Sequence, residues 1–137
     1  MSREQNVATQ ERFGAEVVNG GAISVIDEIV APDFVDHDPA PDQGPGAAGF
    51  KDFWTAFRGA FPDLSVEVDT MVADDDQVAI AYRARGTHQG DLQGVAPTGR
   101  TVDVRGVQIT RFDADGRMVE RWGSSDQLTM MQQVGAV

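Results

Sequence analysis

The sequence has 137 residues, no cysteine and a single lysine, Lys51. The absence of cysteine excludes disulfides, thiolate nucleophiles, cysteine-ligated zinc and iron–sulfur clusters. Lys51 and the arginines together number 11 against 22 acidic residues, which gives a formal net charge of −11. Binding to phosphate requires clustered basic side chains. We therefore expect neither nucleic acid nor an anionic membrane as a partner.

Long apolar runs are also missing. The segment Met1–Asn6 is polar and leads into a charged stretch, without the apolar run that a signal peptide or a membrane-spanning helix needs. With no cysteine either, we expect a cytoplasmic protein. The composition is 41% hydrophobic and 24% charged, which is enough to bury one core, so we expect a single domain over residues 1–137.

Helical signals dominate the first half of the chain. Ser2 followed by Gln5 is a capping-box pattern, and it predicts a helix over residues 2–19. Apolar residues at helical spacing predict a short second helix over 22–31. The segment 34–46 is rich in proline, glycine and aspartate, and we expect a loop there.

Five aromatic residues at helical spacing predict a third helix that ends before Pro62: Phe50, Phe53, Trp54, Phe57 and Phe61. From Ser65 onward the hydrophobic period changes to two. This period predicts a four-strand antiparallel meander, with strands over 65–73, 77–88, 100–112 and 117–125. Helices that precede a sheet indicate an α+β fold. We expect a cone-shaped, curved antiparallel sheet with the helices packed on its concave face around a pocket.

Several short strings carry a family resemblance: Val35–Pro39, Gly49–Phe50, Phe61–Leu64, Gly86–Gly90, Pro97–Gly99 and Glu120–Asp126. Together, in this order, they resemble the SnoaL-like polyketide and ester cyclases over about Phe13 to Gly135. The resemblance implies the cone-shaped fold shared with nuclear transport factor two and the ketosteroid isomerases, and a homodimer or larger homo-oligomer. Such proteins include cyclases, hydroxylases and members without an assigned activity, so fold alone leaves function open.

Asp126 is the predicted catalytic residue. If its strand is unbroken, Asp126 shares an inward face with Trp122, and desolvation there would raise the pKa of the carboxyl group. In the cyclases that this chain resembles, the matching aspartate is the general acid/base of an intramolecular aldol ring closure, with no cofactor or metal. The alternative is that Asp126 caps a helix beginning near Gln127.

Both histidines, His37 and His88, lie in segments expected at the mouth of the cone. A neutral imidazole there can hold a substrate carbonyl or donate to a developing enolate. For His37 the alternative is a hydrogen bond to Asp36 or Asp38. A metal site on these three neighbours is not expected, because adjacent residues rarely converge on one ion.

Three further side chains are expected to line the pocket with Trp122: Trp54, Tyr82 and Gln108. An inward amide such as Gln108 needs a polar partner, which is either the substrate or another buried side chain. Glu120 shares the face of Asp126 unless a bulge changes the alternation of β-strand side chains. On an unbroken strand we favour an ion pair between Glu120 and an arginine; the alternative is that Glu120 is a second acid in the site.

These inferences predict a cofactor-free enzyme that moves a proton on a small hydrophobic carbonyl compound, with aldol ring closure as the leading reaction. An epoxide hydrolase on the same fold would need two carboxylates and an arginine around one water. The sequence is also compatible with a hydroxylase and with a non-catalytic ligand-binding protein. The outer sheet face, if covered, is the natural dimer surface.

Overall fold

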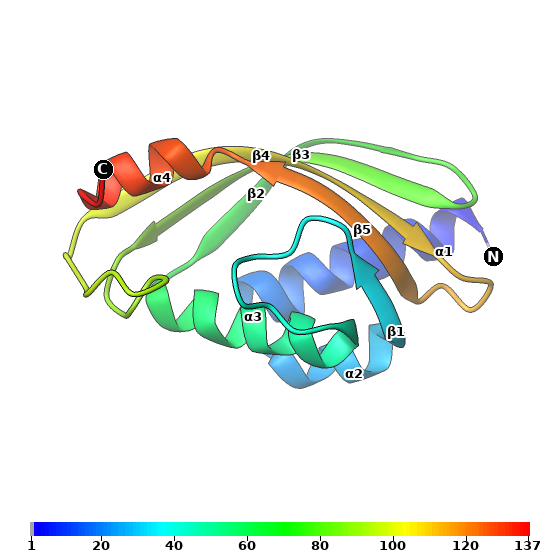
Figure 1. Cartoon of the computed structure of the whole chain (residues 1–137). Helices are drawn as coiled ribbons and strands as arrows, with labels where there is room; N and C mark the ends of the chain where they lie inside the picture. The colour runs from blue at the N-terminus through cyan, green and yellow to red at the C-terminus, as the bar shows by residue number, and fades with distance from the viewer. Residues whose placement is uncertain (1) are drawn as a thin grey trace.

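A five-stranded sheet arches over the helices in the computed structural model, which describes residues 2–137 (Figure 1). The spatial order is β1-β5-β4-β3-β2, and the strands from β2 to β5 form an antiparallel meander. The strand bounds are β1 Val30–Asp36, β2 Ser65–Ala73, β3 Gln77–Thr87, β4 Thr101–Phe112 and β5 Met118–Ser125. The expected α+β class and the four-strand meander are therefore confirmed.

The helices lie largely under the concave side of the sheet (Figure 1). Their bounds are α1 Arg3–Arg12, α2 Ile26–Ile29, α3 Gly46–Ala60 and α4 Gln127–Val134, with a π-helical segment η1 at Phe13–Asn19 and a 3-10 turn η2 at Ile23–Val25. Ser2 caps α1 by accepting a hydrogen bond of 3.1 Å from the Gln5 amide, as the capping pattern predicts. No helix within residues 2–137 is both long enough and apolar enough to span a membrane.

One strand was not expected. The predicted helix over 22–31 ends at Ile29, and the chain then forms β1, which enters the segment expected to be a loop. β1 runs parallel to β5 at the edge of the sheet, where a proline such as Pro32 is tolerated. This pairing places Asp36 beside Arg121. It brings the end of β1 to the concave side of the sheet.

Side-chain alternation along β4 shows which face of the sheet is inward. Val102 and Val104 are buried, whereas the alternate residues Thr101 and Asp103 are exposed. The buried set packs on α3 and η1 through a cluster of phenylalanine rings that includes Phe13, Phe34, Phe50 and Phe61. This core leaves a space between the helices and the middle of the sheet.

Candidate functional site

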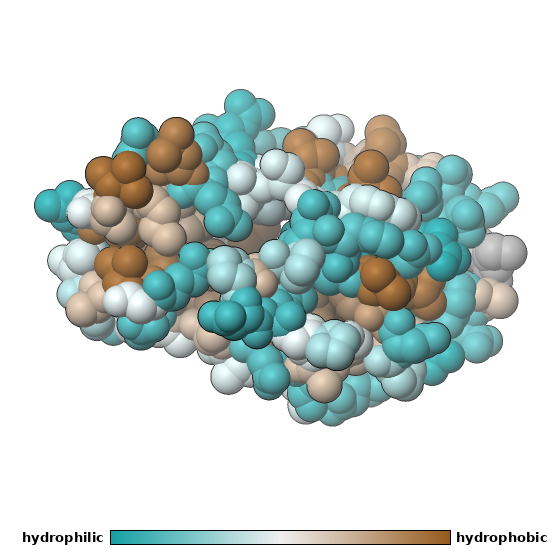
Figure 2. Space-filling view, viewed as in Figure 1, coloured by the Kyte–Doolittle hydropathy of each residue, from teal (hydrophilic) through white to brown (hydrophobic). Residues whose placement is uncertain are grey.

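A cavity of about 700 Å³ lies between the concave face of the sheet and the helical layer formed by α1, η1 and α3. This volume is within the range of small-molecule sites. Its walls are mainly apolar and include Phe50, Phe53, Trp54, Phe57, Met71, Ile80 and Val104. A hollow near the middle of the molecular face, surrounded mostly by hydrophilic residues, is visible in the space-filling view (Figure 2).

Arg121 is the only basic residue among residues 2–137 that lines this cavity. Its Nη1 donates to Asp36 Oδ1 over 2.8 Å, and its Nε donates to Gln108 Oε1 over 3.0 Å. The side chains of Asp36 and Arg121 are only 7% and 17% exposed. A buried ion pair is tolerated when further hydrogen bonds satisfy both partners, and here Gln108 supplies one of them.

The loop after β1 completes the coordination of Asp36. Gln43 Nε2 donates to Asp36 Oδ2 over 3.1 Å, and the Asp38 amide donates to Asp36 Oδ1 over 3.0 Å. Gln43 is held in turn, because its Oε1 accepts from the Ala40 amide. The carboxylate of Asp36 is thus fully used in fixing Arg121 and the loop.

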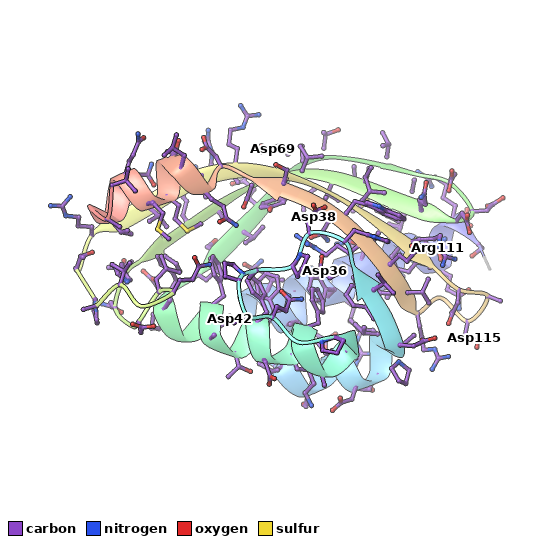
Figure 3. All side chains as sticks on the ribbon, viewed as in Figure 1. Asp36, Asp38, Asp42, Asp69, Arg111 and Asp115 are labelled. Carbon is purple, nitrogen blue, oxygen red and sulfur yellow. The ribbon has the colours of Figure 1, made fainter. Side chains whose placement is uncertain are left out.

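Asp38 also lines the cavity, but it is an exposed residue and is bound differently. Its Oδ2 accepts a hydrogen bond of 2.8 Å from the Gly123 amide, whereas its Oδ1 has no hydrogen-bond partner in residues 2–137. Arg121 Nη2 also makes no hydrogen bond to the described chain, and it lies so close to Gly123 that a Cβ there would be 2.5 Å away. Asp36 and Asp38 lie near each other at the centre of the molecule, below β5 (Figure 3). Gly123 is therefore next to both residues: its amide holds the Asp38 carboxylate through Oδ2, and Arg121 Nη2 lies beside it.

Tyr82 adds a neutral hydroxyl to the cavity. Its register partner on β4 is Gly106, whose own partner on β5 is Ser125. The Tyr82 phenol lies over Gly106, on the side of Ser125. Burial raises the pKa of Tyr82 above its ordinary value, although Arg121 and the Ser125 hydroxyl oppose the shift. Tyr82 is therefore protonated at neutral pH and can donate a hydrogen bond.

Trp54, Tyr82 and Gln108 line the cavity, as expected from the sequence. The expectation that Trp122 points inward is wrong. Trp122 pairs with the half-exposed Ile109 on the convex face, where its ring stacks on His37 at 4.7 Å and 9°. The inward residues of β5 are the alternate set, Arg121, Gly123 and Ser125.

The predicted surroundings of Asp126 are also wrong. Asp126 is exposed and is not among the residues that line the cavity. Its carboxylate accepts hydrogen bonds from the Thr129 hydroxyl at 2.7 Å and the Thr129 amide at 3.0 Å, and these bonds lower its pKa. The alternative of a helix cap is confirmed, because Asp126 is the N-cap of α4. This position leaves the Asp126 carboxylate outside the cavity, with both of its oxygens bonded to Thr129.

The cap predicts how stability depends on pH. Since the folded pKa of Asp126 is depressed, its stabilising contribution is present above the unfolded pKa and is lost as pH falls through the folded pKa. Asp126→Ala should thus lower the urea midpoint at neutral pH, and the difference from the wild type should shrink in strong acid. A difference that stays constant across this range would contradict the assignment.

The two histidines are not at the cavity. His88 is fully buried, with Nδ1 2.9 Å from Thr98 Oγ1 and its ring against Phe61. His37 Nε2 lies 2.8 Å from Glu120 Oε2 on the outer face, so the expected bond to Asp36 or Asp38 is not formed. The positions expected for both histidines are therefore wrong.

Glu120 has an arginine partner, as favoured from the sequence. It accepts hydrogen bonds from Arg111 and is bonded to His37. Two hydrogen bonds lower the pKa of Glu120: the one with His37 has the larger effect, and the one with Arg111 has the next largest. Glu120 is thus an ion-paired residue of the outer face.

Sequence reasoning missed Arg121 because the inward face of β5 was assigned to the wrong alternate residues. The position of Gln108 could have indicated the correct face. Gln108 points inward, as predicted, and its partner across the β4–β5 ladder is Gly123, which shares a face of β5 with Arg121. The sequence predictions for Asp36 and Asp38 concern a hydrogen bond to His37 and the absence of a metal site, and they do not involve Arg121. Their role depended on recognising β1 as a strand.

The comparisons with known proteins agree with this geometry. The family model for the SnoaL-like polyketide cyclases matches residues 8–134. IdmH, a candidate polyketide cyclase from Streptomyces antibioticus, is 34% identical with a TM-score of 0.80, covering 96% of this chain and 99% of its own. AclR, a candidate hydroxylase from Streptomyces galilaeus, is 30% identical with a TM-score of 0.85 and 99% coverage of both chains. TsrD from Streptomyces laurentii, at 24% identity and a TM-score of 0.88, covers 100% of this chain and 99% of its own and shares the fold. No curated protein matches the sequence.

Proposed function

Because the chain belongs to the SnoaL-like polyketide cyclase family, we propose that it closes a ring by an intramolecular aldol reaction on a hydrophobic carbonyl compound held in the cavity. The proposal depends on one observation. Asp38 and Arg121 both contact Gly123 and line the cavity, and Asp38 Oδ1 and Arg121 Nη2 have no hydrogen-bond partner among residues 2–137.

In the proposed reaction Asp38 is the general base. Asp38 removes a proton from a carbon between two carbonyl groups, and the electron pair of the C–H bond moves onto a carbonyl oxygen as an enolate. Arg121 Nη2 donates to that oxygen, where the negative charge develops. The carbon then attacks a second carbonyl of the same molecule. The alkoxide formed takes the proton back from Asp38, so the product is an isomer of the substrate and no redox partner is needed.

Three other residues support these two groups. Asp36 and Gln108 hold the guanidinium of Arg121 in place through Nη1 and Nε, which leaves Nη2 for the substrate. Positioning of this kind avoids reorganisation during the reaction. Tyr82, which burial keeps protonated, is a second donor for a substrate oxygen.

The first step can be tested with ethyl 2-naphthoylacetate, an aromatic β-keto ester. Its methylene protons should exchange with deuterium faster with the protein than without it, as followed by proton NMR in weakly acidic D₂O. A related ester that carries an aldehyde in reach of the methylene carbon should give a cyclic isomer of unchanged mass. Binding without exchange would favour a ligand-binding protein and contradict the proposal.

One observation favours an epoxide hydrolase as a second candidate. Asp36 and Asp38 both contact the guanidinium of Arg121 in the cavity, Asp36 through its carboxylate and Asp38 through its main-chain carbonyl, so two acidic residues and an arginine, the set that such an enzyme needs, lie together. Hydrolysis of an aromatic epoxide such as stilbene oxide to its diol, without exchange of the β-keto ester, would support this candidate over the cyclase.

We propose further that the protein is a homodimer that pairs through the convex face of the sheet. Exposed apolar side chains gather there, and the charged residues beside them are already paired within the chain, as in the ion pair of Arg83 with Asp103. The apolar set consists of three exposed residues, Val72, Val107 and Ile109, and the half-buried Trp122 beside Ile109.

A charge in this apolar set should dissociate the dimer. Val107→Asp places a carboxylate next to its own symmetry mate or against apolar atoms, and either arrangement is costly. Sedimentation velocity should show a dimer for the wild type and a monomer for the variant. Val137→Asp, at the exposed C-terminus, is the control and should leave the dimer intact. A monomeric wild type would contradict the proposal.

A further inference from the structure

Two polar groups in the cavity wall have no partner among the described residues. The first is Gln10, on the last turn of α1, which lines the cavity although the residue is only 4% exposed. Its Oε1 is buried without a hydrogen bond, and its amide nitrogen also has no partner among residues 2–137. Buried polar groups are nearly always hydrogen-bonded, so an unpartnered carboxamide in a cavity wall needs an explanation.

The second group is the indole N–H of Trp54. The Trp54 ring lines the same cavity, and its Nε1 is buried with no acceptor in the described part of the chain. Trp54 packs edge-on against Phe13, at 5.7 Å between ring centroids, and Phe13 is three residues after Gln10. Both groups therefore belong to the helical wall of the cavity, whereas Arg121 belongs to the sheet.

We propose that Gln10 and Trp54 form a second polar subsite that binds a hydroxyl group of the substrate. One hydroxyl can pair the two buried unpartnered atoms, because its oxygen accepts from Trp54 Nε1 and its hydrogen is donated to Gln10 Oε1. The inference rests on the proposed function, since it takes this cavity as the substrate site. It adds a substrate class: a flat hydroxylated ketone or keto ester whose hydroxyl is remote from the reacting carbonyl.

The position of the subsite explains how such a substrate would be oriented. The reacting carbonyl faces Arg121 on β5, and the hydroxyl faces α1 and α3 on the opposite wall. A substrate without the hydroxyl leaves two buried polar groups unpaired. Sites built in this way discriminate more strongly than apolar pockets do.

The test compares two ligands that differ by one hydroxyl, 9-fluorenone and 2-hydroxy-9-fluorenone. Their dissociation constants are measured by calorimetry with the wild type, Gln10→Met and Trp54→Phe. The wild type should bind the hydroxylated ligand about tenfold more tightly. Gln10→Met should lose this preference, and Trp54→Phe, which keeps a ring but lacks the N–H, should lose part of it. Gln127→Met, the same substitution at an exposed glutamine that also lines the cavity, should keep the preference.

Stability gives an independent readout. Because the Gln10 carboxamide has no partner within residues 2–137, Gln10→Met should leave the urea midpoint of the ligand-free protein unchanged or raise it. A lower midpoint together with equal weakening of both ligands would show a structural role and overturn the proposal. An unchanged hydroxyl preference in Gln10→Met would also overturn it. If either of these results is found and the wild type still exchanges the β-keto ester, the subsite is refuted but the proposed reaction is not. If the wild type binds neither fluorenone and shows no exchange, both the subsite and the proposed reaction are refuted.

Discussion

Asp38→Asn is expected to slow exchange of the β-keto ester by about 10²- to 10⁴-fold, the usual contribution of a general base. Asparagine is nearly isosteric and its amide oxygen can still accept from the Gly123 N–H, so the loop should keep its place. The amide cannot take a proton from carbon. The measurement is the exchange rate by NMR at saturating ester, with the urea midpoint as the check on folding.

Asp126→Asn is the matched control for this variant. It makes the same chemical change at an exposed carboxylate that does not line the cavity, and asparagine is also a good N-cap. Exchange should therefore stay near the wild-type rate. The opposite pattern, with Asp38→Asn active and Asp126→Asn inactive, would return the catalytic role to Asp126 and refute the assignment of the base.

Arg121→Met is expected to lose both exchange and stability. Methionine fills much of the space of the arginine stem, but it leaves the Asp36 carboxylate without its charge partner, and that side chain is only 7% exposed. Breaking one side of a buried ion pair costs about 3–5 kcal/mol of the free energy of unfolding. Exchange should fall by about 10²-fold or more relative to the wild type, because the enolate loses its hydrogen-bond donor. Urea unfolding and NMR exchange measure the two effects separately.

The double variant Asp36→Leu/Arg121→Met separates stability from catalysis. With both charges removed, no unpaired carboxylate is buried, and most of the lost stability should return. Exchange should remain absent. A double variant as unstable as Arg121→Met would show that Asp36 is not the source of the penalty, and recovered exchange would exclude Arg121 from the reaction.

Much of the helical layer and the meander could be predicted because their signals are local. The aromatic spacing from Phe50 onward predicts α3, and Ser2 with Gln5 predicts the start of α1. The change to a period of two after Ser65 predicts β2, and turn residues separate the strands that follow. The family resemblance extended these local features to the complete fold, and the family is confirmed.

β1 could not be predicted from local signals. It contains Pro32 and charged residues, and its partner strand, β5, is more than 80 residues later in the chain. Such pairing depends on tertiary contacts that a short window of sequence does not contain. The candidate site depends on this pairing, because it brings Asp36 and Asp38 to Arg121.

The sequence alone determined that residues two apart in β5 share a face, that Asp126 can cap a helix and that Gln108 is an inward amide. Only the tertiary structure decided which face of β5 lines the cavity. Alternation is symmetric between the two faces, and β5 has polar residues on both: Arg121 is inside and Glu120 is outside. The choice comes from the pairing with β4 and from burial of the Arg121 charge against Asp36, neither of which is encoded by the period of a single strand.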